Sequence, residues 1–481
     1  MADKNQTILD FITEYNSKAI TPMHMPGHKR NIAAANYLTA LGGGYDYTEI
    51  DGLDDLHDAD GIIKDAMDKA ASLWHSKKTF FIVNGSTCGI LSGIRCATSY
   101  GDSVLVARNC HKAVYHAIEL CGLHPYFIAP AVDDSFEIYS SIDPVEIEKA
   151  LLAHPSIRLV ILTSPTYEGV ISDINSISAI AHSYHIPVLV DEAHGSHLDH
   201  CDYFNGGAVN GGGDIVIQSL HKTLPSLTQT ALAHINGNLI SSSDFAYELG
   251  IFETSSPSYL LMSSIDGCVN LISKQGRLLF DNWKCNLQEF DNSMRKIKKL
   301  KILCHGEDSI NNHTCLYKFD RSKIVISTKD TNLSGTALMH ILRNNYKIEL
   351  EMASNTYAIA MTGLLERPES LDILSRALLA IDQDCKAILS SAALSVPPIP
   401  PMKTTITKAL SCKGSIVPAN KAVGKVIGEY VWAYPPGIPL IVPGEVITAD
   451  FLQCVDNYYK SGIPLKKTFS NNYNGFHVVE L

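Results

Sequence analysis

A lysine that directly follows a buried strand is the residue of this chain with the clearest chemical potential. In residues 215–231, IVIQSLHKTLPSLTQTA, an apolar run leads into Ser219, His221 and Lys222. A lysine usually lies on the surface, but α/β proteins bind ligands beyond the carboxyl ends of their strands. Lysine amines form imines with carbonyl compounds, and the best-known partner in enzymes is pyridoxal phosphate. A site for that cofactor also needs a phosphate cradle, an acid at the pyridine nitrogen and a wall against the ring.

The segment NGSTCG, residues 84–89, is suited to hold the phosphate. It joins a predicted strand to a predicted helix through a glycine and two hydroxyl residues, Ser86 and Thr87. Backbone N–H groups and the helix dipole favour an anion at such a helix start, and the hydroxyls add donors. The same composition is typical of an ordinary helix N-cap, so this segment alone does not define a phosphate site.

Two further strand ends supply the acid and the wall. VLVDEAHG ends a strand with Asp191 and continues to His194, while RNCHKA places His111 just past another strand. A carboxylate beside the pyridine nitrogen keeps that nitrogen protonated, and a histidine can stack on the ring. Each residue also has a common structural explanation, as a helix cap or a core histidine. Four such signals at successive strand ends of one domain favour the cofactor site.

A zinc site is the competing interpretation of the segment HGSHLDHCD. It spaces His194, His197 and His200 three residues apart, and Cys201 and Asp202 follow. On a helix this spacing could place imidazoles together around a metal. The glycine and the polar run favour a loop instead, and Asp191 nearby already has a role. The sequence therefore predicts no metal site.

The order of predicted elements indicates an α/β fold with a mostly parallel sheet. Apolar runs bounded by turn residues alternate with segments of helical periodicity, which is the pattern of strands joined by crossover helices. The strands are expected at 79–85, 103–108, 159–165, 186–192 and 214–219, and the helices at 62–74, 88–99, 111–121, 144–153 and 173–184.

The second half of the chain has a different pattern. A long helix is predicted over about 270–300, followed by mixed strands and helices to about 390. VPPIPPM, residues 396–402, reads as a stiff connector. In YPPGIPLIVPGE, residues 434–445, four prolines exclude a helix or a central strand, so a rigid extended loop is expected.

Composition excludes several functional classes. The chain has 481 residues, enough for two or three domains, and a formal net charge of −11, which gives no electrostatic footprint for nucleic acid. No apolar run approaches the roughly 20 residues that span a bilayer, and the start of the chain has no signal-peptide pattern. The twelve cysteines include no C-x-x-C pair, which favours reduced thiols in a cytoplasmic enzyme.

Nearly the whole chain resembles the bacterial ornithine/lysine/arginine decarboxylases. The matching stretches run in order along the chain: TPMHMPGHKR, TEIDGLDDLHDADGIIKDA, NGSTCGI, RNCHKA, TSPTYEGV, VDEAHGSH, QSLHKTLPSLTQTA, TSSPSYLLMSSID and YPPGIPLIVPGE. The resemblance implies the aminotransferase-like type I fold, with a seven-stranded, mostly parallel sheet in the large domain and a smaller α+β domain. It also implies four parts: an N-terminal arm at 1–60, the cofactor-binding large domain at 61–295, the small domain at 296–395, and a C-terminal decarboxylase segment at 396–481.

The resemblance assigns roles to the residues found above. Lys222 would bind pyridoxal phosphate covalently, Asp191 would pair with the pyridine nitrogen, and His111 would lie against the ring. His194 would lie near ring and substrate, and Glu445 would meet the distal cationic group of the substrate. The catalytic residues would be Lys222, His111 and His194, and one of these three would protonate the α-carbon after carbon dioxide leaves. The phosphate would be held by four polar residues, Ser86, Thr87, Ser219 and His221. One departure is Leu220, where many relatives have threonine, which removes one possible phosphate contact.

The implied reaction is decarboxylation of a basic L-amino acid, arginine first, then lysine or ornithine, feeding polyamine metabolism. The implied assembly is a homodimer or larger homo-oligomer, in the short form that lacks an N-terminal wing domain because the first motif begins near residue 21. An aminotransferase of the same fold is the main rival. Many of these clamp the substrate carboxylate with a C-terminal arginine, whereas the last arginine here is Arg376, which leaves Arg343, Arg367 and Arg376 as possible clamps. A non-catalytic protein that binds the cofactor is the third reading.

Overall fold

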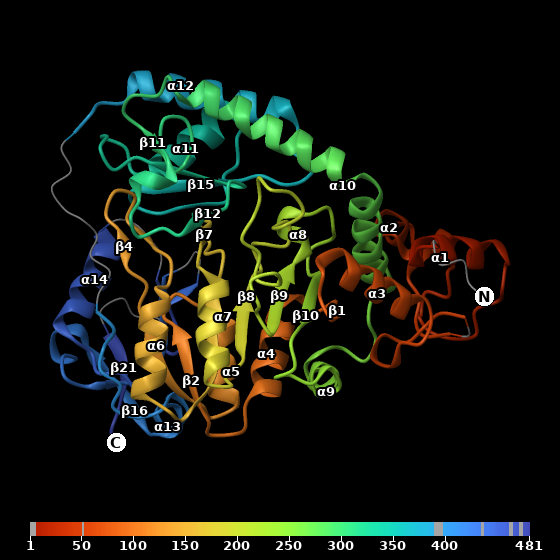
Figure 1. Cartoon of the computed structure of the whole chain (residues 1–481), viewed down its shortest axis with the longest axis horizontal. Helices are drawn as coiled ribbons and strands as arrows, with labels where there is room; N and C mark the ends of the chain where they lie inside the picture. The colour runs from red at the N-terminus through yellow and green to blue at the C-terminus, as the bar shows by residue number, and fades with distance from the viewer. Residues whose placement is uncertain (1–5, 51, 389–397, 434–436, 461–464, 471–474) are drawn as a thin grey trace.

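A seven-stranded sheet lies at the centre of the computed structural model, which describes residues 6–50, 52–388, 398–433, 437–460, 465–470 and 475–481 (Figure 1). Its strands, in spatial order, are β1 (Lys78–Ile82), β10 (Ala231–Ile235), β9 (Ile215–Ser219), β8 (Val188–Asp191), β6 (Ile157–Thr163), β2 (Ser103–Ala107) and β3 (His124–Ile128). The neighbours from β9 to β3 are parallel, whereas β10 is antiparallel to both β1 and β9. The predicted fold class and the mostly parallel sheet are confirmed.

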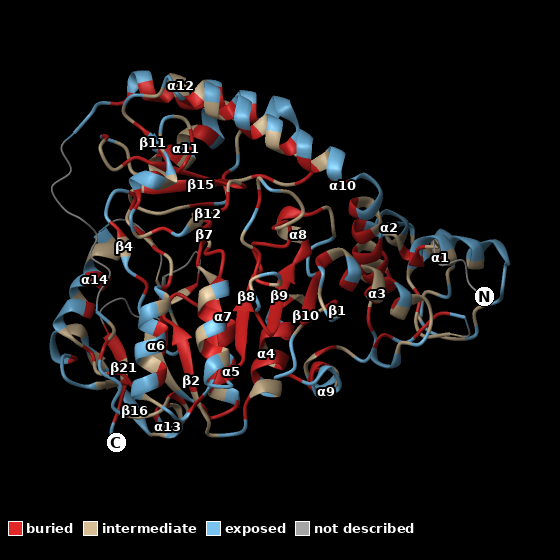
Figure 2. Ribbon diagram, viewed as in Figure 1, coloured by how far each residue is buried: buried red, intermediate tan, exposed pale blue. Residues whose placement is uncertain are grey.

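Helices cover both faces of this sheet. They are α3 (Ile62–Trp74), α4 (Gly85–Ala97), α5 (Lys112–Leu120), α6 (Pro144–Ala153), α7 (Ile174–Ser183) and α9 (Ser242–Phe252). The helices α6 and α7 lie side by side on the face nearer the viewer in Figure 1. The strands other than the edge strand β3 are mostly buried between these layers, as their apolar sequences require, whereas β3 is only partly buried (Figure 2). The helices predicted at 62–74 and 144–153 begin and end as predicted, and the others deviate by one to three residues.

Helix α4 lies unusually close to the sheet. A Cβ on Gly89 would lie 2.8 Å from the Cδ1 of Ile82, and a Cβ on Gly93 would lie 2.8 Å from the Cδ1 of Leu189. Two glycines on the inner face therefore let the helix backbone pack directly on the sheet. Its first turn is thereby fixed at the carboxyl end of β1.

A long helix leads from the large sheet to a small one. Helix α10 (Tyr259–Met294) begins well before the predicted residue 270, because the side chain of Ser258 caps it by accepting from the Leu261 N–H. The small antiparallel sheet has the order β11 (Lys301–Ile302), β13 (Lys323–Ser327), β15 (Tyr357–Met361), β14 (Met352–Ala353), and α11 (Gly335–Tyr346) and α12 (Pro368–Asp384) pack with it. Short pieces complete this region: β4 (Val132–Asp133), β5 (Ile138–Tyr139), β7 (Val170–Ile171), β12 (Lys318–Phe319) and the 3-10 turn η4 (Ile310–Asn312).

The N-terminal arm joins the same core. It contains α1 (Ile8–Ser17), α2 (Asn36–Ala40) and the 3-10 turns η1 (Ile32–Ala34), η2 (Gly43–Tyr45) and η3 (Leu56–Asp58). The Ile8 N–H donates to Asp266 of α10 at 2.7 Å. One buried hydrophobic cluster runs from Ile8 through α3 and α10 to Ile381 of α12. Because this cluster crosses the boundaries proposed at 60 and 295, the division into four parts stays a prediction.

The C-terminal segment has a hydrophobic cluster of its own. Its elements are α13 (Ile406–Ser411), β16 (Gly414–Pro418), η5 (Ala419–Lys421), β17 (Val426–Ile427), β18 (Val431–Ala433), β19 (Ile438–Ile441), α14 (Ala449–Lys460), β20 (Leu465–Lys467) and β21 (Gly475–Val479).

The rigid loop predicted at 434–445 is wrong in part. Residues 438–441 form β19, the edge strand of the sheet β19-β18-β20. An edge strand tolerates Pro439 because one of its sides needs no N–H donors. Residues 434–436, and residues 396–397 of the predicted connector, lie outside the described residues. In the described part of the chain, no helix is long and apolar enough to cross a membrane.

Candidate active site

A cavity of about 640 Å³ lies beyond the carboxyl ends of the parallel strands. All eight residues predicted to bind the cofactor line it: Ser86, Thr87, His111, Asp191, His194, Ser219, His221 and Lys222. Residues of the small sheet, Glu351 and Met361, and Ile438 of β19 complete its wall. The structure therefore brings together side chains that the sequence spreads over 137 positions of the large domain (222 − 86 + 1).

Lys222 extends its amine into this cavity from the short helix α8 (Leu220–Thr223), which follows β9. Its Nζ lies 2.9 Å from Nε2 of His194. Burial lowers the pKa of Lys222, and the Asp191 carboxylate opposes that shift. Burial also holds the pKa of His194 well below its ordinary value, with the Lys222 charge acting in the same direction. The imidazole is therefore neutral at neutral pH, and its Nε2 accepts an N–H from Lys222.

Asp191 is the last residue of β8 and is buried at 3% exposure. The Ala193 N–H donates to its Oδ1 at 3.2 Å. Burial raises the pKa of this carboxyl group, and the Lys222 charge opposes the shift. A carboxylate held in so apolar a place needs a cation, such as a protonated pyridine nitrogen, as its partner.

The first turn of α4 lies at the end of the cavity where the phosphate cradle is expected. Gly85 has a φ of +75°, which turns the chain from β1 into the helix. Ser86 lies opposite Ser219, with their hydroxyl oxygens 2.6 Å apart. His221 is fixed from behind, since its Nδ1 lies 3.0 Å from the carbonyl oxygen of Thr230 and donates to it. Hydroxyls and helix N–H groups thus converge at one end of the cavity, as a phosphate requires.

Polar atoms without protein partners mark the rest of the cavity. The Oδ1 of Asn109 and the Nδ1 of His194 are buried and have no hydrogen-bond partner. His111 caps α5 and accepts from the Ala113 N–H, and burial lowers its pKa to about 4, so its ring is neutral. A neutral ring, a buried donor and a buried acceptor without partners, and a helix start suited to an anion fit a planar, polar, phosphorylated cofactor.

A buried network supports the lysine segment from behind. Thr223 follows Lys222 and lies 3.1 Å from Nδ1 of His197, whose Nε2 lies 2.9 Å from Asp320. Asp320 also pairs with Lys323 at 3.1 Å. The Thr223 carbonyl accepts from the Leu364 N–H at 2.9 Å. The small sheet thereby holds the backbone next to the reactive amine.

The same contacts separate the three histidines of the zinc interpretation. His194 faces Lys222 and His197 faces Asp320. His200 packs edge-on against Trp74 and stacks on Phe280. Their rings therefore have three different environments, and the structure does not gather them around one metal position.

Glu445 is placed differently from the sequence expectation. Its two carboxylate oxygens each accept from Arg108 at 2.9 Å, and Oε2 also accepts from the Val442 N–H. Both side chains are buried, and Glu445 is not among the described residues that line the cavity. The buried guanidinium requires this counter-charge, so within one chain the structure does not bring Glu445 to a substrate position.

Comparison with known proteins identifies the family. A family model described as "Orn/Lys/Arg decarboxylase, major domain" matches residues 6–340, and one described as "Orn/Lys/Arg decarboxylase, C-terminal domain" matches residues 390–478. The chain belongs to the Orn/Lys/Arg decarboxylase family. Proteins named arginine decarboxylase from Bacillus anthracis and Bacillus subtilis are each 31% identical to it over 95% of its length, and it covers 93% and 94% of theirs.

Solved structures confirm the fold. A lysine decarboxylase from Francisella novicida superposes with a TM-score of 0.82 at 17% identity, covering 98% of this chain and 81% of that chain. A ureidoglycine-glyoxylate aminotransferase from Bacillus subtilis gives 0.53 at 15% identity over 69% of this chain and 87% of that chain. Enzymes of the Orn/Lys/Arg decarboxylase family and of this fold depend on pyridoxal phosphate. The predictions of a decarboxylase and of the type I fold are confirmed.

The three candidate arginine clamps of the aminotransferase alternative lie elsewhere in this decarboxylase. Arg343 pairs with Glu349 and Arg376 with Asp372, all on the surface, and Arg367 is exposed. No arginine is among the described residues that line the cavity. Arg367 does line a smaller pocket that shares Lys222 with the cavity, so it stays a candidate clamp for a substrate carboxylate.

Sequence reasoning missed two carboxylates of the cavity, Glu168 and Glu351. Glu168 is buried and accepts from the Tyr357 hydroxyl at 3.0 Å, and Glu351 accepts from the Tyr167 hydroxyl. Tyr167 and Glu168 belong to TSPTYEGV, one of the stretches that carry the resemblance. Glu351 comes from the small sheet, and no local pattern around it signals a site.

Proposed function

We propose that the chain removes carbon dioxide from a basic L-amino acid with pyridoxal phosphate bound to Lys222, and that arginine is its preferred substrate. The observation that carries the proposal is the position of the Lys222 amine inside the cavity. It lies 2.9 Å from His194 and close enough to the buried Asp191 carboxylate for that charge to raise the pKa of the amine. The preference for arginine is supported by the relatives that bear that name. Lysine is the second candidate and ornithine the third.

Each part of the cavity has a role in holding the cofactor. Ser86, Thr87, Ser219 and His221 receive the phosphate, with the helix start of α4 behind them. Asp191 holds the proton of the pyridine nitrogen, and His111 lies against the ring. When bound, pyridoxal phosphate accepts the electron pair that the departing carboxylate leaves on the α-carbon.

Lys222 is also the group that returns a proton to the α-carbon. The rings of His111 and His194 are neutral, since burial lowers the pKa of both. Lys222 Nζ can carry a proton beside His194 Nε2, which accepts its N–H and fixes the direction of the amine. His194 is thus a positioning residue for the lysine.

The charge of the cavity suits a cationic substrate side chain. Glu351 adds negative charge to its wall and lies close enough to Lys222 to raise the pKa of that amine, and Glu168 adds a buried carboxyl group whose own pKa is raised by burial. A contact from Glu445 to the distal cation would require its pair with Arg108 to open.

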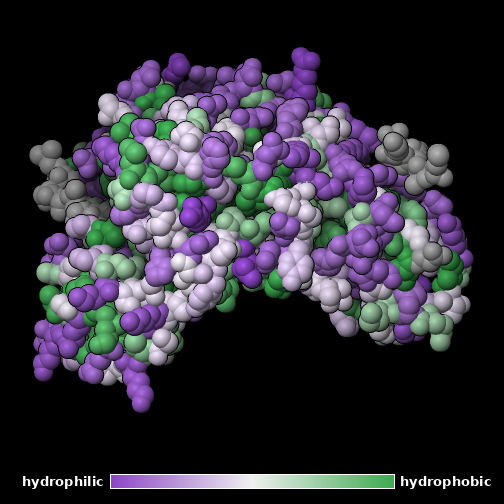
Figure 3. All heavy atoms as spheres, turned by 60° about the horizontal axis from the view of Figure 1, so that its bottom comes forward, coloured by the Kyte–Doolittle hydropathy of each residue, from purple (hydrophilic) through white to green (hydrophobic). Residues whose placement is uncertain are grey.

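We further propose that the active unit is a homodimer. The N-terminal arm forms the right limb of the arch seen in Figure 3 and carries large apolar side chains in contact with solvent. Met23 is 88% exposed, Tyr37 68% and Leu41 66%. Apolar residues gathered in this way favour burial against a second copy. Light scattering should give twice the chain mass or more, and Met23→Asp with Leu41→Asp should reduce it.

The direct test measures carbon dioxide release by the cofactor-loaded protein with arginine, lysine and ornithine. We expect release with at least one of the three and the highest kcat/KM with arginine. Formation of a keto acid with an amino acceptor, without carbon dioxide, would instead establish an aminotransferase. Cofactor binding without turnover of any of the three would leave a binding protein and overturn the proposal.

A further inference from the structure

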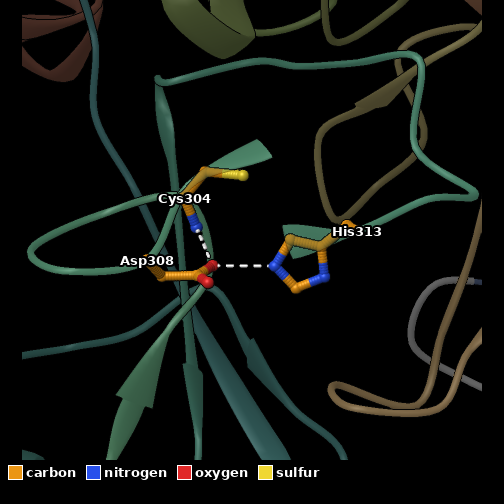
Figure 4. Close-up of side chains that lie close together, drawn as sticks. All are labelled: Cys304, Asp308 and His313. Carbon is orange, nitrogen blue, oxygen red and sulfur yellow. Dashed lines mark hydrogen bonds and ion pairs between the residues drawn. The ribbon is translucent and has the colours of Figure 1, made fainter. Parts of the chain in front are cut away.

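A second cluster of reactive side chains lies at the start of the small domain, outside the cavity. The chain between β11 and β12 brings together Cys304, Asp308 and His313, with one donor atom of each within 4.8 Å of the others. Figure 4 shows the Asp308 carboxylate between the backbone of Cys304 and the ring of His313. Cys304 and His313 are buried and Asp308 is partly exposed. Of the described residues that line the cavity, none belongs to this cluster.

We propose that Cys304, Asp308 and His313 form a zinc site. Sulfur, imidazole nitrogen and carboxylate oxygen are the three ligand types that zinc combines in proteins. Magnesium and calcium prefer oxygen ligands alone, so a thiol and an imidazole argue against them. Three protein ligands leave a fourth tetrahedral position for water.

The surroundings of the cluster orient its ligands as a zinc site requires. Nδ1 of His313 lies 2.8 Å from a carboxylate oxygen of Asp133, which leaves Nε2 as the ligand atom. The Cys304 N–H donates to Asp308 Oδ2 at 2.7 Å, and Asn312 donates to Oδ1 at 3.0 Å. Metal-binding histidines usually donate their second N–H to a carboxylate, and metal-binding carboxylates are themselves hydrogen-bonded.

Only small movements separate the cluster from zinc geometry. At zinc–ligand distances of about 2.0 to 2.3 Å, tetrahedral ligand atoms lie about 3.3 to 3.5 Å apart. His313 Nε2 and Asp308 Oδ2 are 2.9 Å apart, so they must open by a few tenths of an ångström. The remaining separations are at most 4.8 Å and must close by up to about 1.3 to 1.5 Å. The Cys304 thiol and the Nε2–H of His313, which donates to Asp308 when no metal is bound, each release a proton to solvent when they bind the metal.

Zinc at this place would join two parts of the fold. The ligands belong to the loop that precedes β12, and His313 is tied through Asp133 to the hairpin of β4 and β5. The same small domain carries Glu351 and Met361 to the cavity. We therefore assign the metal a stabilising role in seating the small domain, rather than a role in the reaction.

The test measures zinc affinity of the cofactor-loaded protein after treatment with a chelator, by competition with a chromogenic chelator. We expect one tightly bound equivalent in the wild type and at least about a tenfold loss of affinity in Cys304→Ser and in Asp308→Asn. Cys315→Ser is the matched control, because Cys315 lies in the same loop but outside the three-residue cluster. Its Sγ lies 3.9 Å from the Asp133 carboxylate, a contact that a serine hydroxyl can keep. It should retain wild-type affinity.

Cobalt(II) gives a second readout, because a thiolate ligand produces a charge-transfer absorption. This band should form in the wild type and in Cys315→Ser and be absent in Cys304→Ser. Equal zinc affinity in the wild type, Cys304→Ser and Asp308→Asn would overturn the proposal, as would a cobalt complex without the thiolate band. Carbon dioxide release is measured separately, so failure of the zinc site leaves the proposed reaction untouched.

Discussion

Two buried polar regions of this protein differ in whether their polar groups have hydrogen-bond partners within the chain. In the cavity, the Oδ1 of Asn109 and the Nδ1 of His194 have no hydrogen-bond partner. Behind the cavity, two buried charged groups have all their partners, and we call these two places the junctions. Asp320 accepts from His197, Ser322 and Lys323, and the two oxygens of Glu445 accept from the Arg108 guanidinium. Both regions are buried, so exposure to solvent does not explain the difference.

The difference separates binding from support. A buried polar group without a partner costs about 1–3 kcal/mol, whereas a satisfied one costs little. The cavity therefore holds groups at a cost that only a polar ligand removes, and the junctions hold charges whose partners are already present. Substitutions in the cavity should change ligand binding and turnover, and substitutions at the junctions should change folding stability.

Lys222→Ala tests the cavity side of this comparison with the largest expected effect. Removing the amine that lies 2.9 Å from His194 should lower kcat by roughly 10⁴-fold or more, because covalent cofactor attachment and proton return are lost together. The visible absorbance of the lysine-bound cofactor should also disappear. The control is Lys112→Ala, since Lys112 lines the cavity as well. An unchanged visible band in Lys222→Ala would assign the covalent role to another residue.

Glu445→Gln tests the junction side. It leaves the Arg108 guanidinium buried without its counter-charge, and breaking such a pair costs about 3–5 kcal/mol. The free energy of unfolding, measured in urea, should fall by that amount while KM for arginine in the remaining folded enzyme changes little. A large rise in KM without loss of stability would mean that Glu445 meets the substrate, as the family resemblance implies.

The two regions also differ in how far the sequence alone predicted them. Ser86, His111, Asp191 and Lys222 each follow an apolar run, so a local pattern places them at one edge of the sheet. The partners of the junctions come from segments far apart in the chain. Arg108 and Glu445 are 337 positions apart, and no periodicity reveals which distant charge an isolated glutamate will meet.

The same limit explains the other misses. The start of α10 depends on the Ser258 cap, and β19 depends on its neighbour β18, a partner that proline content does not reveal. Conformation also distinguishes the two candidate metal clusters: the close-spaced histidines at 194–200 diverge, whereas Cys304, Asp308 and His313, which have wider spacing, converge in an irregular loop. Ligand spacing is informative only when the backbone between the ligands is known.

Asn109→Leu should have a smaller effect. It should leave the stability of the cofactor-free protein unchanged or higher, and it should weaken cofactor binding. In the cofactor-free protein it removes a buried acceptor that has no partner, so the free energy of unfolding should stay unchanged or rise by about 1 kcal/mol. In the loaded protein the same substitution should weaken pyridoxal phosphate binding, measured by cofactor release on dilution. Loss of stability in the cofactor-free form would show that Asn109 has a structural partner.

The smallest expected effect concerns an unpaired histidine outside the cavity. His200 packs against Trp74 and Phe280, its Nε2 has no partner, and burial lowers its pKa to about 4. Below a pH of about 6.5, His200 takes up a proton in the unfolded chain but stays neutral in the folded chain. The free energy of unfolding therefore falls as the pH drops towards 4.

The substitution His200→Phe should remove the part of this fall that His200 causes, which is on the order of 1 kcal/mol between pH 7 and pH 5. Urea unfolding of both proteins at the two pH values measures it, and the other histidines cancel in the difference. Equal losses in the two proteins would mean that His200 is protonated in the fold, in which case the unpaired nitrogen has found a partner.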